Sequence, residues 1–150
     1  MTKPTSLTRA ILDTNWAKWA YTKTERALEK MPELKLLQDR LLSLGGDWAA
    51  LQPEPDLKAL LNKGQLFKGK VIFKPMTPCQ CHSNCAQLWD KHPKTCTIAT
   101  GWALSKDGIW RQHTWILKAR TIIETTEART MYYGIVLSNE EANSFWWHNR

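Results

Sequence analysis

Apolar residues in the first 64 positions recur at the three- and four-residue spacing of amphipathic helices. A first helix, capped by Thr5 or Ser6, is expected along one broad face: Leu7, Ile11, Leu12, Trp16, Trp19 and Ala20. A second helix is expected after Pro32 and should end at Gly45. Its apolar stripe is Leu34, Leu37, Leu41 and Leu44. A short third helix should follow Asp56, so this part of the chain is predicted to be helical.

From residue 65 onward the pattern changes to short β-branched and alternating runs, which are typical of strands. Strands are expected over residues 66–74, 95–104, 109–117, 120–126 and 130–137, and a helix over 83–91. Ser138 and Glu141 form a capping box for a last helix. The order predicts an α+β fold, in which a central helix packs on four or five antiparallel strands. We expect a single domain over 1–150, with a helical part (1–64) and an α+β core (65–150).

Composition narrows the classes of function. The chain has 150 residues, 43% of them hydrophobic, which suits one globular domain. The net charge of +7 and 9 tryptophans make nucleic-acid binding possible, but the charges are spread without a basic block, so it is not favoured. No apolar run is long enough to span a membrane, and no signal peptide is recognisable, so a cytoplasmic protein is expected. The sequence leaves the oligomeric state open.

The four cysteines lie close together, between Cys79 and Cys96. Cys81 comes directly before the predicted helix, where the helix dipole favours a thiolate. A thiolate nucleophile needs a base and a group that orients it. His113 is on a strand face with Arg111 and Trp115, and Glu124 on the next strand can accept its second ring proton.

Side chains near this trio have predicted roles as well. Backbone amides at the helix start, with Gln80 or Asn84, can stabilise an oxyanion. Arg111 is either a clamp for an anionic substrate group or half of an ion pair, and Trp115 can form the wall of a substrate groove. Trp16 and Trp19 are expected in the core.

The order of a cysteine at a helix start, a histidine on a following strand and a polar residue on the next resembles the papain-like cysteine hydrolases, including small members of the NlpC/P60 type. The resemblance covers about residues 66–137. It implies a papain-like core in which Cys81 is the nucleophile, His113 the base and Glu124 the orienting residue. It further implies an enzyme that cleaves a peptide or other amide through a thioester, as a peptidase, amidase or deamidase, without a cofactor.

Two alternatives stay open. The first is a non-enzymatic interaction module stabilised by zinc, because thiolates and imidazoles are the ligands that zinc prefers. Its ligands would be Cys79, Cys81, Cys85 and Cys96, with His82 and His92 also available. The second is a basic nucleic-acid-binding domain.

Overall fold

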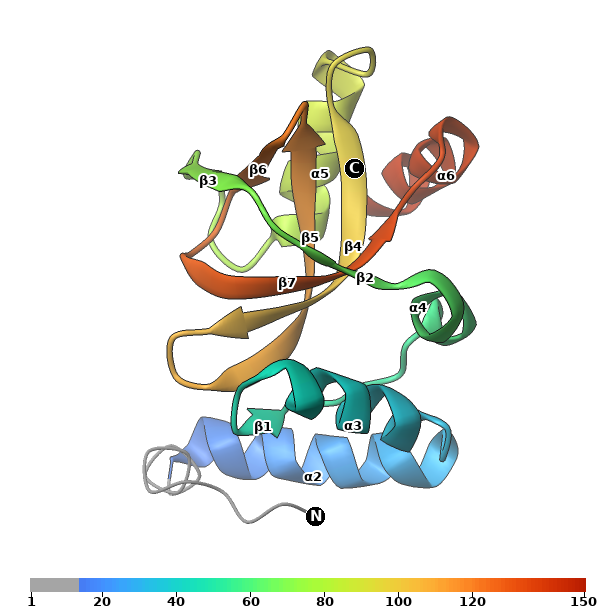
Figure 1. The fold of residues 1–150 in the computed structure, drawn as a ribbon, viewed down its shortest axis with the longest axis vertical. Coiled ribbons are helices and arrows are strands. Elements are labelled where there is room, and N and C mark those ends of the chain that lie inside the picture. The colour runs from blue at the N-terminus through green and yellow to red at the C-terminus, as the bar shows by residue number, and fades with distance from the viewer. Residues whose placement is uncertain (1–13) are drawn as a thin grey trace.

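The computed structural model describes residues 14–150 of the chain, and within them it contains five helices and seven strands (Figure 1). The helices are α2 (Asn15–Lys30), α3 (Leu34–Leu44), α4 (Leu57–Lys63), α5 (Cys81–Lys91) and α6 (Asn139–Asn149). The strands are β1 (Trp48–Ala49), β2 (Gln65–Phe67), β3 (Lys70–Phe73), β4 (Thr97–Ser105), β5 (Ile109–Lys118), β6 (Thr121–Glu124) and β7 (Arg129–Val136). The predicted α+β class is confirmed.

The N-terminal helices differ in how well the apolar pattern predicted them. Much of the first predicted helix, with its caps Thr5 and Ser6, lies outside the described residues. The helix α2 starts after Thr14, whose side chain accepts a hydrogen bond from the Ala17 amide, and it continues to Lys30. Its buried side chains are Ala17, Ala20, Thr24 and Ala27, which are small and give little hydropathy signal. By contrast, α3 follows its predicted leucine stripe and ends at Gly45.

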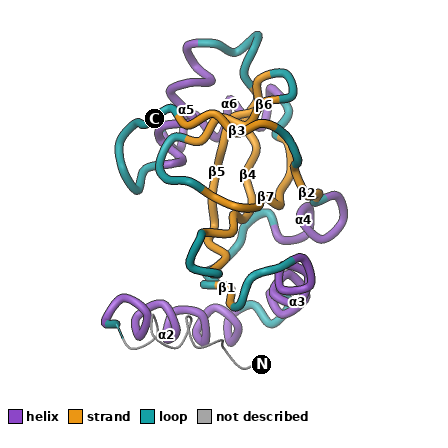
Figure 2. The backbone as a smooth tube through the Cα atoms, turned by 60° about the vertical axis from the view of Figure 1, so that its left-hand side comes forward, coloured by secondary structure: helices purple, strands orange, loops and turns teal. Residues whose placement is uncertain are grey.

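The sheet is mixed and has seven strands, in place of the four or five antiparallel strands predicted. Its main path runs β2-β7-β4-β5-β6-β3, and both β1 with β5 and β3 with β6 are parallel pairs. The predicted strand 66–74 is divided at Lys68 and Gly69 into β2 and β3, which lie at opposite ends of this path. Because only these two residues join them, the sheet must curl back on itself, as Figure 2 shows.

Gly69, in the link between β2 and β3, lies where only glycine fits. A Cβ atom on Gly69 would lie 2.6 Å from the carbonyl oxygen of Arg120, in the turn between β5 and β6. A backbone contact of this kind cannot be relieved by rotating a side chain, so the close approach of the two segments depends on glycine. Gly69 therefore marks in the sequence where the strand divides. The curling of the sheet, which depends on contacts with distant strands, has no such local mark.

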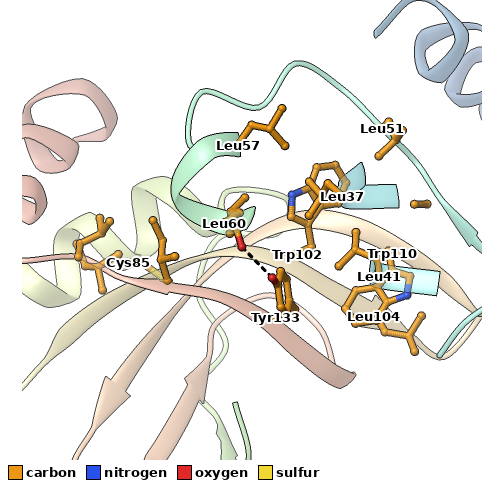
Figure 3. Close-up of a cluster of buried hydrophobic side chains, with 14 of the residues drawn as sticks. Leu37, Leu41, Leu51, Leu57, Leu60, Cys85, Trp102, Leu104, Trp110 and Tyr133 are labelled. Atoms are coloured by element: carbon orange, nitrogen blue, oxygen red, sulfur yellow. Dashed lines mark hydrogen bonds between the residues drawn. The ribbon is translucent and has the colours of Figure 1, made fainter. Parts of the chain in front are cut away.

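The two faces of the curled sheet bury separate clusters. The larger cluster joins Trp102, Trp110 and Ile116 of the sheet to leucines of α3 and α4 and to Cys85 of α5 (Figure 3). Within it, the Tyr133 hydroxyl donates to the Leu60 carbonyl at 2.8 Å. The cluster on the other face consists of Ala99, Ala103, Trp115, Ile122 and Tyr132. The larger cluster therefore fixes α5 against the strands, with the start of the helix at the edge of the core.

Among residues 14–150, no helix is both long enough and apolar enough to cross a bilayer.

Candidate active site

Cys81 is the first residue of α5, one turn before Cys85, which is buried in the core. The chain enters the helix through Cys79, whose φ of 62° lies in the left-handed region that non-glycine residues seldom adopt. Asn84 holds this entry in place: its Nδ2 donates to the Thr77 carbonyl at 2.9 Å and to the Thr125 Oγ1 at 3.3 Å. The segment before the helix is thereby tied to the residue that follows β6.

Asn84 was one of two side chains predicted to stabilise an oxyanion. It is 1% exposed and both of its amide hydrogens are engaged, so it positions the helix start and has no hydrogen left for a substrate. Gln80, the other candidate, is exposed at the N-cap and makes no side-chain capping bond. The backbone N–H groups of the first turn of α5 have no partner within the helix, so they are also available as oxyanion donors.

His113 and Glu124 lie side by side in the interior. The His113 Nε2 atom is 2.8 Å from the Glu124 Oε1 atom, and the two residues are 1% and 0% exposed. Glu124 accepts three further hydrogen bonds, from the Tyr132 hydroxyl at 2.9 Å and from the amide and the hydroxyl of Thr126, both at 3.0 Å. Burial alone would raise the pKa of this carboxyl, but the hydrogen bond and charge of His113 hold it at about 2. Glu124 is therefore an anion whose position is fixed on several sides.

Cys81 interacts with two imidazoles. Burial disfavours its thiolate, but His113, which lines the same cavity, and then His82 stabilise the thiolate, outweigh this effect and lower the thiol pKa to about 5. Burial lowers the pKa of His113, but its interactions with Cys81 and Glu124 outweigh burial and raise this pKa above its usual value. Since Nε2 of His113 is bound to Glu124, Nδ1 is the nitrogen left to face the thiol. The arrangement favours a thiolate beside an imidazolium near neutral pH.

Sequence reasoning missed His82 and Tyr132 at this site. The Nδ1 atom of His82 lies 3.1 Å from the Cys81 Sγ, and its ring packs at 5.6 Å from that of Phe145 in α6. The signal for His82 was its place next to Cys81 in the first turn of a helix. Tyr132 is 2% exposed and reaches Glu124 from β7, a contact that only the curvature of the sheet creates.

A cavity of about 360 Å³ opens beside the thiol. Its lining includes Trp16, Cys79, Cys81, Gln112 and His113. Trp16, predicted to lie in the core, is 39% exposed, so α2 contributes an aromatic wall to the cavity. Trp115, predicted to form such a wall, is 0% exposed and packs on Tyr132 with ring centroids 5.0 Å apart, so that prediction is wrong.

Arg111 also lines this cavity, and its charge is already paired. Its guanidinium makes two hydrogen bonds to Asp107, at 2.8 and 3.1 Å, and lies 4.7 Å from the centroid of the Trp16 ring. Of the two roles considered for Arg111, the ion pair is the one that the contacts support. The guanidinium fixes Trp16 against the turn between β4 and β5.

The four cysteines of the alternative zinc site differ in their solvent exposure. Cys79 is exposed, whereas Cys85 and Cys96 are buried. Across residues 14–150, no group of three or more His, Cys, Asp or Glu side chains is arranged to hold a metal ion.

Compared with family models, curated proteins and solved structures, the chain matches none, so the contacts described above are the basis for a functional assignment.

Proposed function

We propose that the protein is a cysteine-dependent amide hydrolase, a peptidase, amidase or deamidase that acts through a thioester. Cys81 is the nucleophile, His113 the general base and acid, and Glu124 the residue that orients His113. One observation carries the proposal: a buried carboxylate is bound to one nitrogen of a buried imidazole, and this imidazole lines the same cavity as a thiol at a helix start.

Each part of this arrangement has a role in acyl transfer. The Cys81 thiolate attacks the carbonyl carbon of the amide, and the oxygen becomes an oxyanion near the first N–H groups of α5. The His113 imidazolium then gives its proton to the leaving nitrogen, the C–N bond breaks, and a thioester remains on Cys81. The neutral imidazole takes a proton from water, whose oxygen attacks the thioester. The acid is released, and the proton returns the site to its starting state.

Glu124 orients the His113 ring throughout this cycle. Its hydrogen bond to Nε2 leaves Nδ1 as the nitrogen that exchanges protons with the thiol, and its charge stabilises the imidazolium. Tyr132 and Thr126 hold the carboxylate in place, so it remains ionised although it is buried. The sequence of nucleophile on a central helix, base on β5 and carboxylate on β6 supports a papain-like core.

The test uses a broad pool of peptides, because the substrate is not known. A tryptic digest of a proteome, with added Gln- and Asn-containing peptides, is incubated with the protein in H₂¹⁸O and analysed by mass spectrometry. Amide hydrolysis inserts one ¹⁸O into each new carboxyl group, whether it ends a peptide or replaces a side-chain amide. We expect ¹⁸O-labelled products with the wild type and none with Cys81→Ala. Equal labelling by the two proteins would refute the assignment of Cys81.

A further inference from the structure

One stretch of β5 beside the proposed nucleophile has an unpaired edge. On one side β5 pairs with β4 along almost its whole length, from Trp110 to Leu117. On the other side β1 pairs with Ile109 and Trp110, and β6 pairs with residues 116–118. Figure 2 shows β1 and β6 near opposite ends of β5. Between them, residues 111–115 have no strand partner on this side within the described part of the chain.

The backbone groups that point to this open edge follow from the period of two along a strand. The Trp110 carbonyl accepts a hydrogen bond from the Ala50 amide at 2.9 Å, so it points toward β1 and the open edge. The groups of Gln112 and Thr114 point the same way, but Thr114 is 0% exposed, so Gln112 is the residue whose backbone groups can pair with a ligand. The His113 carbonyl, one residue out of phase, accepts from the Thr100 hydroxyl on β4 at 3.4 Å, as this alternation requires.

The cavity beside Cys81 reaches this edge. Its lining includes Arg111, Gln112 and His113, three consecutive residues of β5. Successive side chains of a strand point to opposite faces of the sheet. A cavity that contacts three consecutive residues therefore extends around the edge of the strand. A second cavity of about 160 Å³ continues along the edge toward residues 50–52, and Trp16 lines both cavities. The stretch of this edge at Arg111 and Gln112 is thus the floor of a groove that leads to the thiol.

We propose that the substrate is an extended peptide whose main chain pairs with Gln112 at this edge, and that this pairing places the scissile amide beside Cys81. The proposal rests on the proposed function and adds its substrate class. An unpaired strand edge recognises a backbone and not a side chain, so binding should tolerate varied residues. Free glutamine or a small amide has no main chain to pair in this way, so the geometry favours a peptidase over an amidase for small molecules.

The test compares covalent probes that differ only in backbone hydrogen bonding. A pool of acetyl-tripeptide chloromethyl ketones with varied side chains alkylates Cys81 by displacement of chloride, and chloroacetone serves as the reference without a peptide. Each probe is also made with a single N-methyl group at each amide in turn. The peptide probes should react faster than chloroacetone, and N-methylation at one position should slow them about tenfold, as expected for the loss of one hydrogen bond. No sensitivity at any position would overturn the proposal.

A pair of variants tests the edge itself. Gln112→Pro removes the N–H at the open edge, where proline is tolerated in strands, and Gln112→Ala keeps it. Both variants lose the side-chain contacts with Gln52 and Glu54. The rate with the peptide probes, divided by the rate with iodoacetamide, should be about tenfold lower in Gln112→Pro than in Gln112→Ala; equal ratios would count against the proposal. If Gln112→Pro does not fold, the N-methyl series decides.

The outcomes separate this proposal from the proposed function. If iodoacetamide modifies Cys81 no faster than Cys79 near pH 6, the nucleophile assignment fails, and the peptide proposal fails with it. If Cys81 is reactive toward iodoacetamide but peptide probes gain nothing over chloroacetone, the nucleophile stands and the peptide groove is refuted.

Discussion

Replacing His113 by glutamine should change how the alkylation of Cys81 depends on pH. Glutamine can still donate a hydrogen bond to Glu124, which otherwise would be left as a buried carboxylate without its main partner, at a cost of about 3–5 kcal/mol. It cannot carry the positive charge that stabilises the thiolate. The substitution therefore tests the electrostatic contact between His113 and Cys81 with limited damage to the fold.

The magnitude follows from the lowering of the Cys81 pKa from 9.0 to about 5. At pH 6 a thiol with a pKa of about 5 is roughly 90% thiolate, and a thiol with a pKa of 9.0 is roughly 0.1% thiolate. The more acidic thiolate is also the weaker nucleophile, by about 60-fold for this difference with a Brønsted slope of about 0.4–0.5. The wild type should thus react about 15-fold faster than an ordinary thiol at pH 6, equally fast near pH 7, and more slowly above it.

The assay is the rate of iodoacetamide modification of Cys81, followed by mass spectrometry of the peptide that contains it between pH 4 and 10. The wild-type rate should rise through a midpoint near pH 5. In His113→Gln the midpoint should move toward the ordinary thiol value, although His82 remains 3.1 Å from the sulfur. The two profiles should therefore cross at about pH 7 if the midpoint returns fully to the ordinary value, and at lower pH if His82 holds it part of the way. Circular dichroism and thermal unfolding provide the control for folding. Unchanged profiles in a folded variant would refute the coupling of His113 to Cys81.

Four further predictions concern the residues around this pair. Glu124 has a lowered pKa, so the stability that its charge contributes is complete above about pH 4.5 and is lost as pH falls toward about 2. The difference in unfolding free energy between wild type and Glu124→Gln should shrink by about 3 kcal/mol over this range in urea titrations, and a constant difference would contradict the lowered pKa. Tyr132→Phe removes a hydrogen bond to a buried charge and should cost about 1.5–3 kcal/mol by the same measurement; a loss below about 0.5 kcal/mol would show that this bond contributes little. Asn84→Ala should lower the melting temperature and slow Cys81 alkylation at pH 6, because the helix entry loses both of its ties; unchanged values would remove its positioning role. EDTA should leave the melting temperature unchanged, and unfolding on chelation would instead favour the zinc module.

Sequence patterns within a few residues of an element predicted the helices and the hairpin. The leucine stripe of α3 and the capping box at Ser138 both lie within a few residues of the helix that they define, and both are present. The start of α5 at Cys81 and the hairpin between β4 and β5 were also within reach of such signals. The contact of His113 with Glu124 was predicted because it needs only two neighbouring strands.

The remaining features depend on contacts between distant segments. The parallel pairing of β3 with β6 arises only when the sheet curls, and no turn between the strands signals it. The same curvature brings Tyr132 to Glu124, and it encloses Trp115, which was expected to line a groove. The exposure of Trp16 could not be read from its apolar helix face, since it depends on what lies opposite that face.

The proposed reaction passes through a thioester on Cys81, and this thioester can be trapped. Excess protein is mixed with the peptide pool under single-turnover conditions, quenched in acid, and digested for mass spectrometry of the peptide that contains Cys81. We expect acyl adducts on Cys81 that neutral hydroxylamine removes, and that are absent when Cys81 is replaced by alanine. Hydrolysis of the pool with no adduct on Cys81, and at the same rate in Cys81→Ala, would contradict this expectation.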